Sequence, residues 1–335
     1  MQNMNWAIRR LAGASTEWVT ITQDEYTSAI SALDDVLHVL ELEEKWDVLI
    51  GNYEELEVEL LRLTTEKAIH RHSTWHDGSR NRRLLNRRVN NLLSSCRLYI
   101  DHLRHSFTRI FGADSSQLTT IDSVRHREYD TSFSYRLLEE LRNYTQHRRL
   151  PIDVELTTFK PTTYGEDSQV ACALTPMLMT ANVLEDEKVK ERFRSELESQ
   201  PERLDLKVHC RGYVHSLYKI HVDVRCLVSP RVTQAESLIT DLMTRYSAQH
   251  SHSLVGLHVV AQTDDTPYPS VTEKKPLFKE PLMELRAMQE RNDLYPDFAR
   301  HYVTGQDTTK IIQERPNNRV ERTGDPRPGH RSAHS

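Results

Sequence analysis

The chain carries an arginine, an asparagine and a histidine close together, at Arg142, Asn143 and His147, where a helical pattern ends. The guanidinium of arginine is permanently cationic and can bind two phosphate oxygens at once. Histidine is the side chain best suited to take or give a proton near neutral pH. With an amide beside them, these groups form a minimal set for cutting a phosphodiester bond without a metal ion. We therefore take Arg142, Asn143 and His147 as the candidate catalytic residues.

Helical spacing relates the three residues to one another. Asn143 and His147 are four positions apart and share a face, whereas Arg142 lies on the adjoining face. One chain thus supplies an incomplete ring of charge. Pro151 ends the helix, because the residue before a proline is pushed towards extended geometry. A purely structural role is also open: Arg142 pairs with Glu139, and His147 stabilises the C-terminal end of the helix.

Five further arginines are candidates for contact with RNA phosphates. Arg148 and Arg149 directly follow His147, and Arg82, Arg83 and Arg87 belong to a dense cationic run between residues 80 and 88. Clustered cations of this kind bind phosphate backbones. The alternative is that the run is the solvated start of a helix, offset by the glutamate-rich segment 41–59.

The spacing of apolar residues predicts the helices that hold these side chains. Leucines, aromatics and β-branched residues recur at steps of three and four, which is the pattern of a helix with one buried face. The predicted helices cover 22–40, 41–71, 81–112 and 117–147, the last with an interruption near Asp130 and Thr131. Thr22-x-x-Glu25 has the form of a capping box at the start of the first helix.

The pattern changes after Pro151. Strands are predicted at 154–159, 170–179 and 254–261, with short strands within 4–21, and helices at 185–199, 204–248 (with Pro230 as a kink or boundary), 277–291 and 296–303. The expected fold class is α+β, mainly α: an antiparallel helical bundle with a small β-containing C-terminal region. The expected parts are a bundle with short N-terminal strands over 1–150, an α+β region packed on it over 151–305, and a disordered tail over 306–335.

The bundle and the motif at its end resemble the HEPN superfamily. The signature of that family is an arginine, a polar residue, and a histidine four to six positions after the arginine, and Arg142-Asn143-x-x-x-His147 fits it. The resemblance implies a metal-independent endoribonuclease that needs no cofactor, binds RNA and forms a homodimer. His147 would be the general base or acid, Arg142 would neutralise charge on the phosphorus, and Asn143 would orient the imidazole.

The resemblance also implies a cellular setting. HEPN-like enzymes include toxins and phage-defence (antiviral) effectors, and an inhibitory or complex-forming protein partner is expected with such a role. The rival interpretation is a non-catalytic helical scaffold or binding module that dimerises or docks a partner protein. The two differ in one observable respect, which is cleavage of RNA.

Composition limits other classes of function. The formal net charge of −5 shows no global basicity. The four cysteines are far apart, so neither a disulfide framework nor a zinc knuckle is expected. We interpret His70, His72 and His76 as having no metal role, and His215 and His221 as surface or partly buried residues. No signal-peptide pattern or membrane-length apolar run is present, so we expect a cytoplasmic protein without membrane contact.

Overall fold

The computed structural model of the chain describes residues 4–12, 17–71, 74–161, 169–250, 253–263, 269–301 and 303. Met1–Arg300 forms one compact unit, and the description below concerns this unit. The segment 306–335, for which composition predicts a disordered tail, lies outside the described residues.

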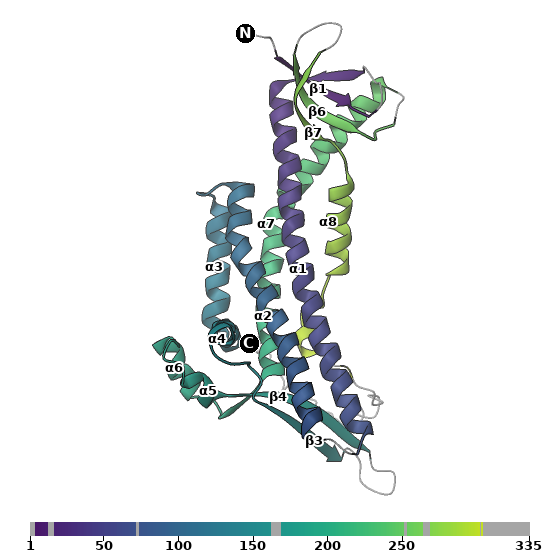
Figure 1. Ribbon diagram of the computed structural model, residues 1–335. Helices are drawn as coiled ribbons and strands as arrows, with labels where there is room; N and C mark the ends of the chain where they lie inside the picture. Colours follow the sequence, from purple (N-terminus) through teal and green to yellow (C-terminus); the bar gives the residue numbers. More distant parts are fainter. Residues whose placement is uncertain are drawn as a thin grey trace, which may run out of the picture. The chain divides into compact units, whose positions relative to one another are not determined.

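Four helices from the first half of the chain and one from the second half pack side by side (Figure 1). They are α1 (Gln23–Ile69), α2 (Trp75–Phe111), α3 (Ser116–Thr131), α4 (Phe133–His147) and α7 (Leu206–Gln249). Helix α1 packs along α2 and α7, and α7 also contacts α3 and α4. The expected class, α+β with mainly helix, is confirmed.

One helix stands where the sequence predicts two, at 22–40 and 41–71. Helix α1 begins at the predicted capping box: the Glu25 N–H donates to Thr22 Oγ1 (3.1 Å), and the Thr22 N–H donates to Glu25 Oε2 (2.8 Å). It then continues without a break, because no proline, glycine or capping residue interrupts the segment around Leu40. The division between two helices was therefore wrong.

Helix α7 joins the second half of the chain to the first. It continues through Pro230, where the sequence allows a kink or a boundary. A proline removes only its own backbone N–H from the ladder, and both Val228 and Ala235 around it are buried in the core. Since α7 packs against α1, α3 and α4, the expected parts 1–150 and 151–305 do not separate into two compact units.

A four-stranded antiparallel sheet pairs the beginning of the chain with residues after α7. Its order is β2-β1-β6-β7, with β1 at Met4–Arg10, β2 at Trp18–Ile21, β6 at Leu257–Thr263 and β7 at Val271–Pro276. Strands expected within 4–21 and near 254–261 are present. Strand β7 was not predicted, because its consecutive polar residues Thr272 to Lys275 show no alternation of apolar and polar residues. Ile8 and Val259 pack with Leu242 of α7 in the core beneath the sheet.

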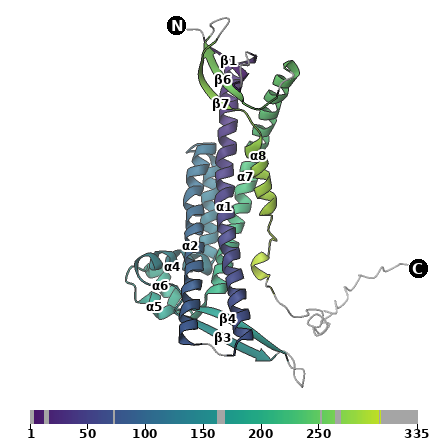
Figure 2. The ribbon, with the colours of Figure 1, turned by 45° about the vertical axis from the view of Figure 1, so that its right-hand side comes forward.

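A three-stranded antiparallel sheet lies at the other end of α1, near the connection from α1 to α2 (Figures 1 and 2). Its order is β3-β4-β5, with β3 at Val154–Pro161, β4 at Val170–Met179 and β5 at Arg203–Asp205. Between β4 and β5 lie α5 (Thr180–Leu184) and α6 (Glu191–Glu198). The helix predicted from Glu185 starts only at Glu191, because Asp186 Oδ1 accepts the Lys188 N–H (3.1 Å) and holds a turn there.

The final helical elements lie along α1 and α7. Helix α8 (Glu280–Arg291) realises the helix predicted at 277–291 and packs on α1. The helix predicted at 296–303 is reduced to the 3-10 turn η1 (Phe298–Arg300), none of whose residues is buried deeply enough to anchor a longer helix. Among the described helices, none has an apolar stretch that could cross a lipid bilayer.

Candidate functional site at the end of helix α4

Helix α4 positions the candidate catalytic residues. Its start is set by Ser132, whose Oγ accepts the Tyr135 N–H (3.2 Å). Its rotation is set by a buried stripe that includes Leu137, Leu141 and Tyr144. The helix ends at His147. The opposite face therefore carries Arg142, Asn143 and His147, of which the last two are exposed and Arg142 is half-buried.

The Arg142 side chain contacts the adjacent Asn143 and does not contact Glu139. Its Nη1 donates to Asn143 Oδ1 (3.3 Å). Glu139 is already engaged, because it accepts hydrogen bonds from the Tyr213 hydroxyl and from Arg97 Nη1, the latter at 2.9 Å. The structural alternative in which Arg142 pairs with Glu139 is therefore wrong, and Arg142 forms no ion pair with any described residue.

His147 lines an open depression of about 350 Å³ at the end of α4. The other lining residues are Tyr144, Arg148, Arg149, Asn182, Glu185 and Asp186. The imidazole is exposed, and no hydrogen bond or ion pair joins it to another described residue. It is therefore accessible to a substrate and to solvent protons.

Arg148 and Arg149 reach the same depression but are paired with acids. Arg148 Nη2 lies 3.0 Å from Asp186 Oδ1, and Arg149 Nη2 lies 3.8 Å from Glu185 Oε2. The backbone hydrogen bond from Lys188 and then the Arg148 guanidinium hold the pKa of Asp186 below its usual value. A phosphate bound here has to compete with these carboxylates. The Arg149–Glu185 pair is exposed, and such a pair contributes about 0–1 kcal/mol, so a phosphate can replace that carboxylate at little cost. The Arg148–Asp186 pair is stronger, because Asp186 is buried.

Asn143 faces a second depression of about 330 Å³, between α2, α3 and α4. Its charged lining is internally paired: Lys190 Nζ lies 3.2 Å from Glu140 Oε1, and Arg97 binds Glu139. Neither Arg142 nor His147 lines this second depression. The structure thus brings His147 together with Arg148 and Arg149, and leaves Arg142 and Asn143 outside that depression.

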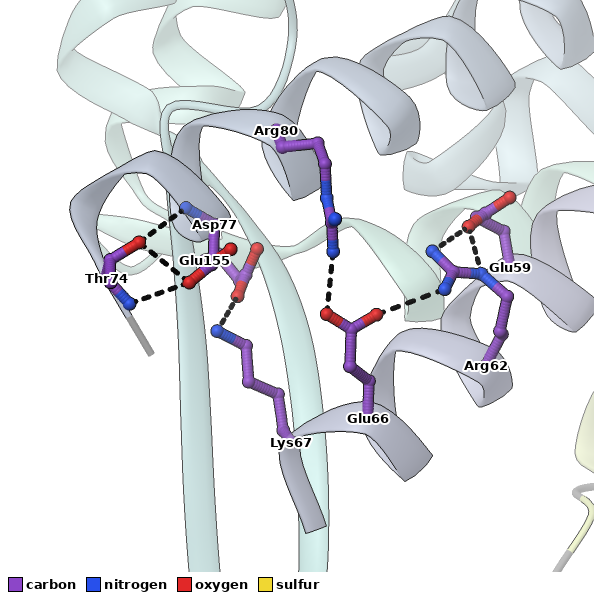
Figure 3. Close-up of polar contacts among 8 residues, drawn as sticks. All are labelled: Glu59, Arg62, Glu66, Lys67, Thr74, Asp77, Arg80 and Glu155. Atoms are coloured by element: carbon purple, nitrogen blue, oxygen red, sulfur yellow. Dashed lines mark hydrogen bonds and ion pairs between the residues drawn. The ribbon is translucent and has the colours of Figure 1, made fainter. Parts of the chain in front are cut away.

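The α2 arginines lie elsewhere. Arg82 Nη1 donates weakly to the Asp153 carbonyl (3.4 Å), Arg83 Nη1 donates to Ser79 Oγ (2.8 Å), and Arg87 is exposed with no partner among the described residues. Their neighbours Arg80 and Arg88 form ion pairs with glutamates of α1, as the offset interpretation predicts; Figure 3 shows Arg80 with Glu66. None of the α2 arginines lines the His147 depression.

Within the described residues, no three histidine, cysteine or carboxylate side chains gather to hold a metal ion. His70 and His76 belong to the described part of the chain, and His72 lies outside it.

The structure also contains a buried polar cluster that sequence reasoning missed. His221 of α7 is 1% exposed, stacks on Trp46 of α1 and contacts the Tyr99 hydroxyl of α2 through Nδ1 (2.8 Å). Its Nε2 lies 3.3 Å from Glu43, which also accepts two bonds from Arg225. The expectation of a surface or partly buried His221 was wrong. The available signal was its place on the apolar stripe of α7, four residues after Leu217.

The pKa values of this cluster follow from burial and pairing. Burial lowers the pKa of His221, with Glu43 opposing. Burial alone would raise the pKa of Glu43, but the His221 imidazole beside it and the two hydrogen bonds from Arg225 outweigh this effect and bring the pKa to about 2. The cluster therefore favours a neutral imidazole and an ionised carboxylate.

We expect the free energy of unfolding to fall as the pH falls from 7 to 3. His221 has a lowered folded pKa, so its contribution is present above about 6.5 and is lost on acidification. Glu43 acts in the same direction between 4.5 and about 2, whereas Asp35, whose pKa burial raises, opposes the change. The midpoint of urea unfolding, measured at pH 8, 6, 5 and 4, reports this loss of stability. A midpoint that does not change with pH would contradict the expectation. His221→Gln should flatten the part between pH 8 and 5.

Comparisons with known proteins found no relative of the chain. No family model, no curated protein and no solved structure matches the chain.

Proposed function

We propose that the chain is a metal-independent endoribonuclease of the HEPN-like type. The observation that supports this proposal most directly is the exposure and the surroundings of His147. It is exposed, without a described partner, in an open depression whose rim carries two arginines. Arg142 and Asn143, hydrogen-bonded to each other, lie one turn earlier on the same helix.

The proposed reaction is an internal transesterification of RNA. His147 takes the proton of a ribose 2′-hydroxyl, and the 2′-oxygen then attacks the adjacent phosphorus. The bond from phosphorus to the 5′-oxygen breaks, and that oxygen takes a proton from an imidazolium. Arginine stabilises the charge that builds up on the phosphate oxygens in the transition state. The products are a 2′,3′-cyclic phosphate and a 5′-hydroxyl.

A second copy of the chain completes this proposal. One chain offers a single imidazole at the depression, and Arg142 does not line it. Two copies related by a two-fold axis along the exposed face of α4 bring two His147 side chains and two Arg142 side chains to one RNA strand. One imidazole then acts as base and the other as acid.

The experiment is cleavage of end-labelled RNA by the full chain in the presence of EDTA. We expect fragments that carry 2′,3′-cyclic phosphate and 5′-hydroxyl ends, which mass spectrometry distinguishes from 3′-hydroxyl and 5′-phosphate ends. Loss of cleavage in EDTA, or the opposite pair of ends, would overturn the proposal.

One observation favours the rival function, a non-catalytic helical binding module. Arg148 and Arg149 are paired with Asp186 and Glu185, which lowers the net positive charge at the depression. A binding module should leave RNA intact under all ionic conditions while it still dimerises or binds a partner protein.

A further inference from the structure

A third depression lies where the end of α1 and the start of α2 meet strand β3. It measures about 440 Å³, and its lining includes Lys67, His70, Arg71, Arg82, Glu155 and Phe159. Three permanent cations thus face a single carboxylate. That carboxylate is already occupied, since Lys67 Nζ lies 3.3 Å from Glu155 Oε1 (Figure 3).

Two further described acids close in sequence to this lining, Asp77 and Glu66, are occupied as well. Asp77 accepts bonds from the Thr74 N–H (2.8 Å) and hydroxyl (2.7 Å) in the cap of α2, and Glu66 binds Arg62 and Arg80 (Figure 3). Arg71 is exposed and has no hydrogen bond or ion pair with a described residue. Among the described residues, the lining of the depression therefore carries more positive than negative charge, which fits an anionic ligand.

Exposed aromatic rings accompany the charge. Phe159, in the lining, is 56% exposed, and Trp75, the first residue of α2, is 78% exposed. A single exposed apolar side chain needs no explanation, but Phe159 lies in the lining of the same depression as Arg71 and Arg82. A positively charged groove with accessible aromatic faces suits single-stranded nucleic acid, because the phosphates pair with the cations and the bases stack on the rings.

Contacts to one residue connect this depression to that of His147. Arg82, in the lining here, donates to the Asp153 carbonyl, and Asn182, in the lining of the His147 depression, donates to Asp153 Oδ1 (2.6 Å). Asp153 thus contacts one lining residue of each depression.

We infer that the surface around Arg71, Arg82 and Phe159 binds single-stranded RNA and holds the substrate strand beside His147. The link to cleavage rests on the proposed function, whereas the binding itself does not. Arg71 and Arg82 pair with phosphates, and Phe159 stacks on a base.

The test is fluorescence anisotropy of a labelled 20-nucleotide single-stranded RNA whose 2′-hydroxyls are methylated, so that it cannot be cleaved. We expect Arg71→Glu to weaken binding about tenfold or more and to lower the salt slope by about one. Phe159→Ala should weaken binding by about fivefold to a hundredfold, and Phe159→Trp should restore it. Both positions are exposed, so circular dichroism and thermal melting should stay unchanged.

The matched controls lie at the other sheet and on α8. Lys274 of β7 is exposed and forms no ion pair with a described residue, so Lys274→Glu reverses the same kind of charge. Met283→Ala, at a residue of α8 that is 67% exposed, removes an apolar side chain. Both should leave binding within about twofold. Equal losses in the controls, or no RNA binding at micromolar protein, would overturn the inference. So would Arg71→Glu and Phe159→Ala variants that bind anionic phospholipid vesicles more weakly but bind RNA as the unchanged chain does.

The outcomes separate the two proposals. RNA binding that depends on Arg71 and Phe159 without cleavage upholds this surface and overturns the nuclease. Cleavage that is indifferent to both residues upholds the nuclease and overturns this surface.

Discussion

Replacement of His147 by alanine is expected to lower RNA cleavage by about 10²- to 10⁴-fold, the usual contribution of a general acid–base group. Among the residues that line the depression at the end of α4, His147 carries the one imidazole, the group most often used in general acid–base catalysis. Single-turnover rates with a labelled RNA, in EDTA, measure the effect.

The control for this variant is His105→Ala. His105 is also an exposed histidine on a bundle helix, and it is not among the buried residues of α2. The His105→Ala variant should cleave RNA at the rate of the unchanged chain. Since His147 is exposed, His147→Ala should melt at the same temperature as the unchanged chain. Equal rates for His147→Ala and the unchanged chain would remove His147 from the mechanism.

Mixing variants tests the second copy. Arg142→Ala and His147→Ala should each be nearly inactive, and both should sediment as dimers. If a composite site forms across the two-fold axis, their mixture contains dimers with one intact Arg142 and one intact His147, which lack the second imidazole and should therefore be slower than the unchanged dimer but faster than either variant alone. Partial activity in the mixture supports the shared site, and a mixture as inactive as its components argues against it.

Removal of the Glu43 carboxylate of α1 should destabilise the folded chain strongly. Glu43→Ala leaves Arg225 and the buried His221 without their acceptor, and breaking a buried ion pair in this way costs about 3–5 kcal/mol. The neighbouring Glu44 is exposed, with no partner among the described residues, so Glu44→Ala should change the free energy of unfolding by no more than about 0.5 kcal/mol. Urea unfolding at pH 7 compares the two.

An isosteric variant separates charge from volume. Glu43→Gln keeps one acceptor oxygen for Arg225, so its loss of stability should lie between those of Glu44→Ala and Glu43→Ala. Similar stability for Glu43→Ala and Glu44→Ala would show that the buried cluster does not hold α1, α2 and α7 together.

Local structure could be predicted from the sequence wherever it depends only on residues that are close together in the chain. The capping box at Thr22 and Glu25 was predicted correctly because both partners lie within one turn. So was the end of α4 just before Pro151, since a proline restricts the residue before it whatever the fold. The strands at 154–159 and 170–179 were likewise predicted from a local pattern.

Contacts between distant residues decided the rest. The strand pairing of β1 with β6, the packing of α7 in the bundle, and the burial of His221 against Trp46 and Glu43 all depend on residues that are far apart in the sequence. At the candidate site, the sequence by itself determined which residues share the exposed face of α4, because helical periodicity sets this. Only the tertiary structure decided that His147 lies in an open depression with Arg148 and Arg149 while Arg142 does not line it, because the walls of that depression come from the segment around Asn182 and Asp186.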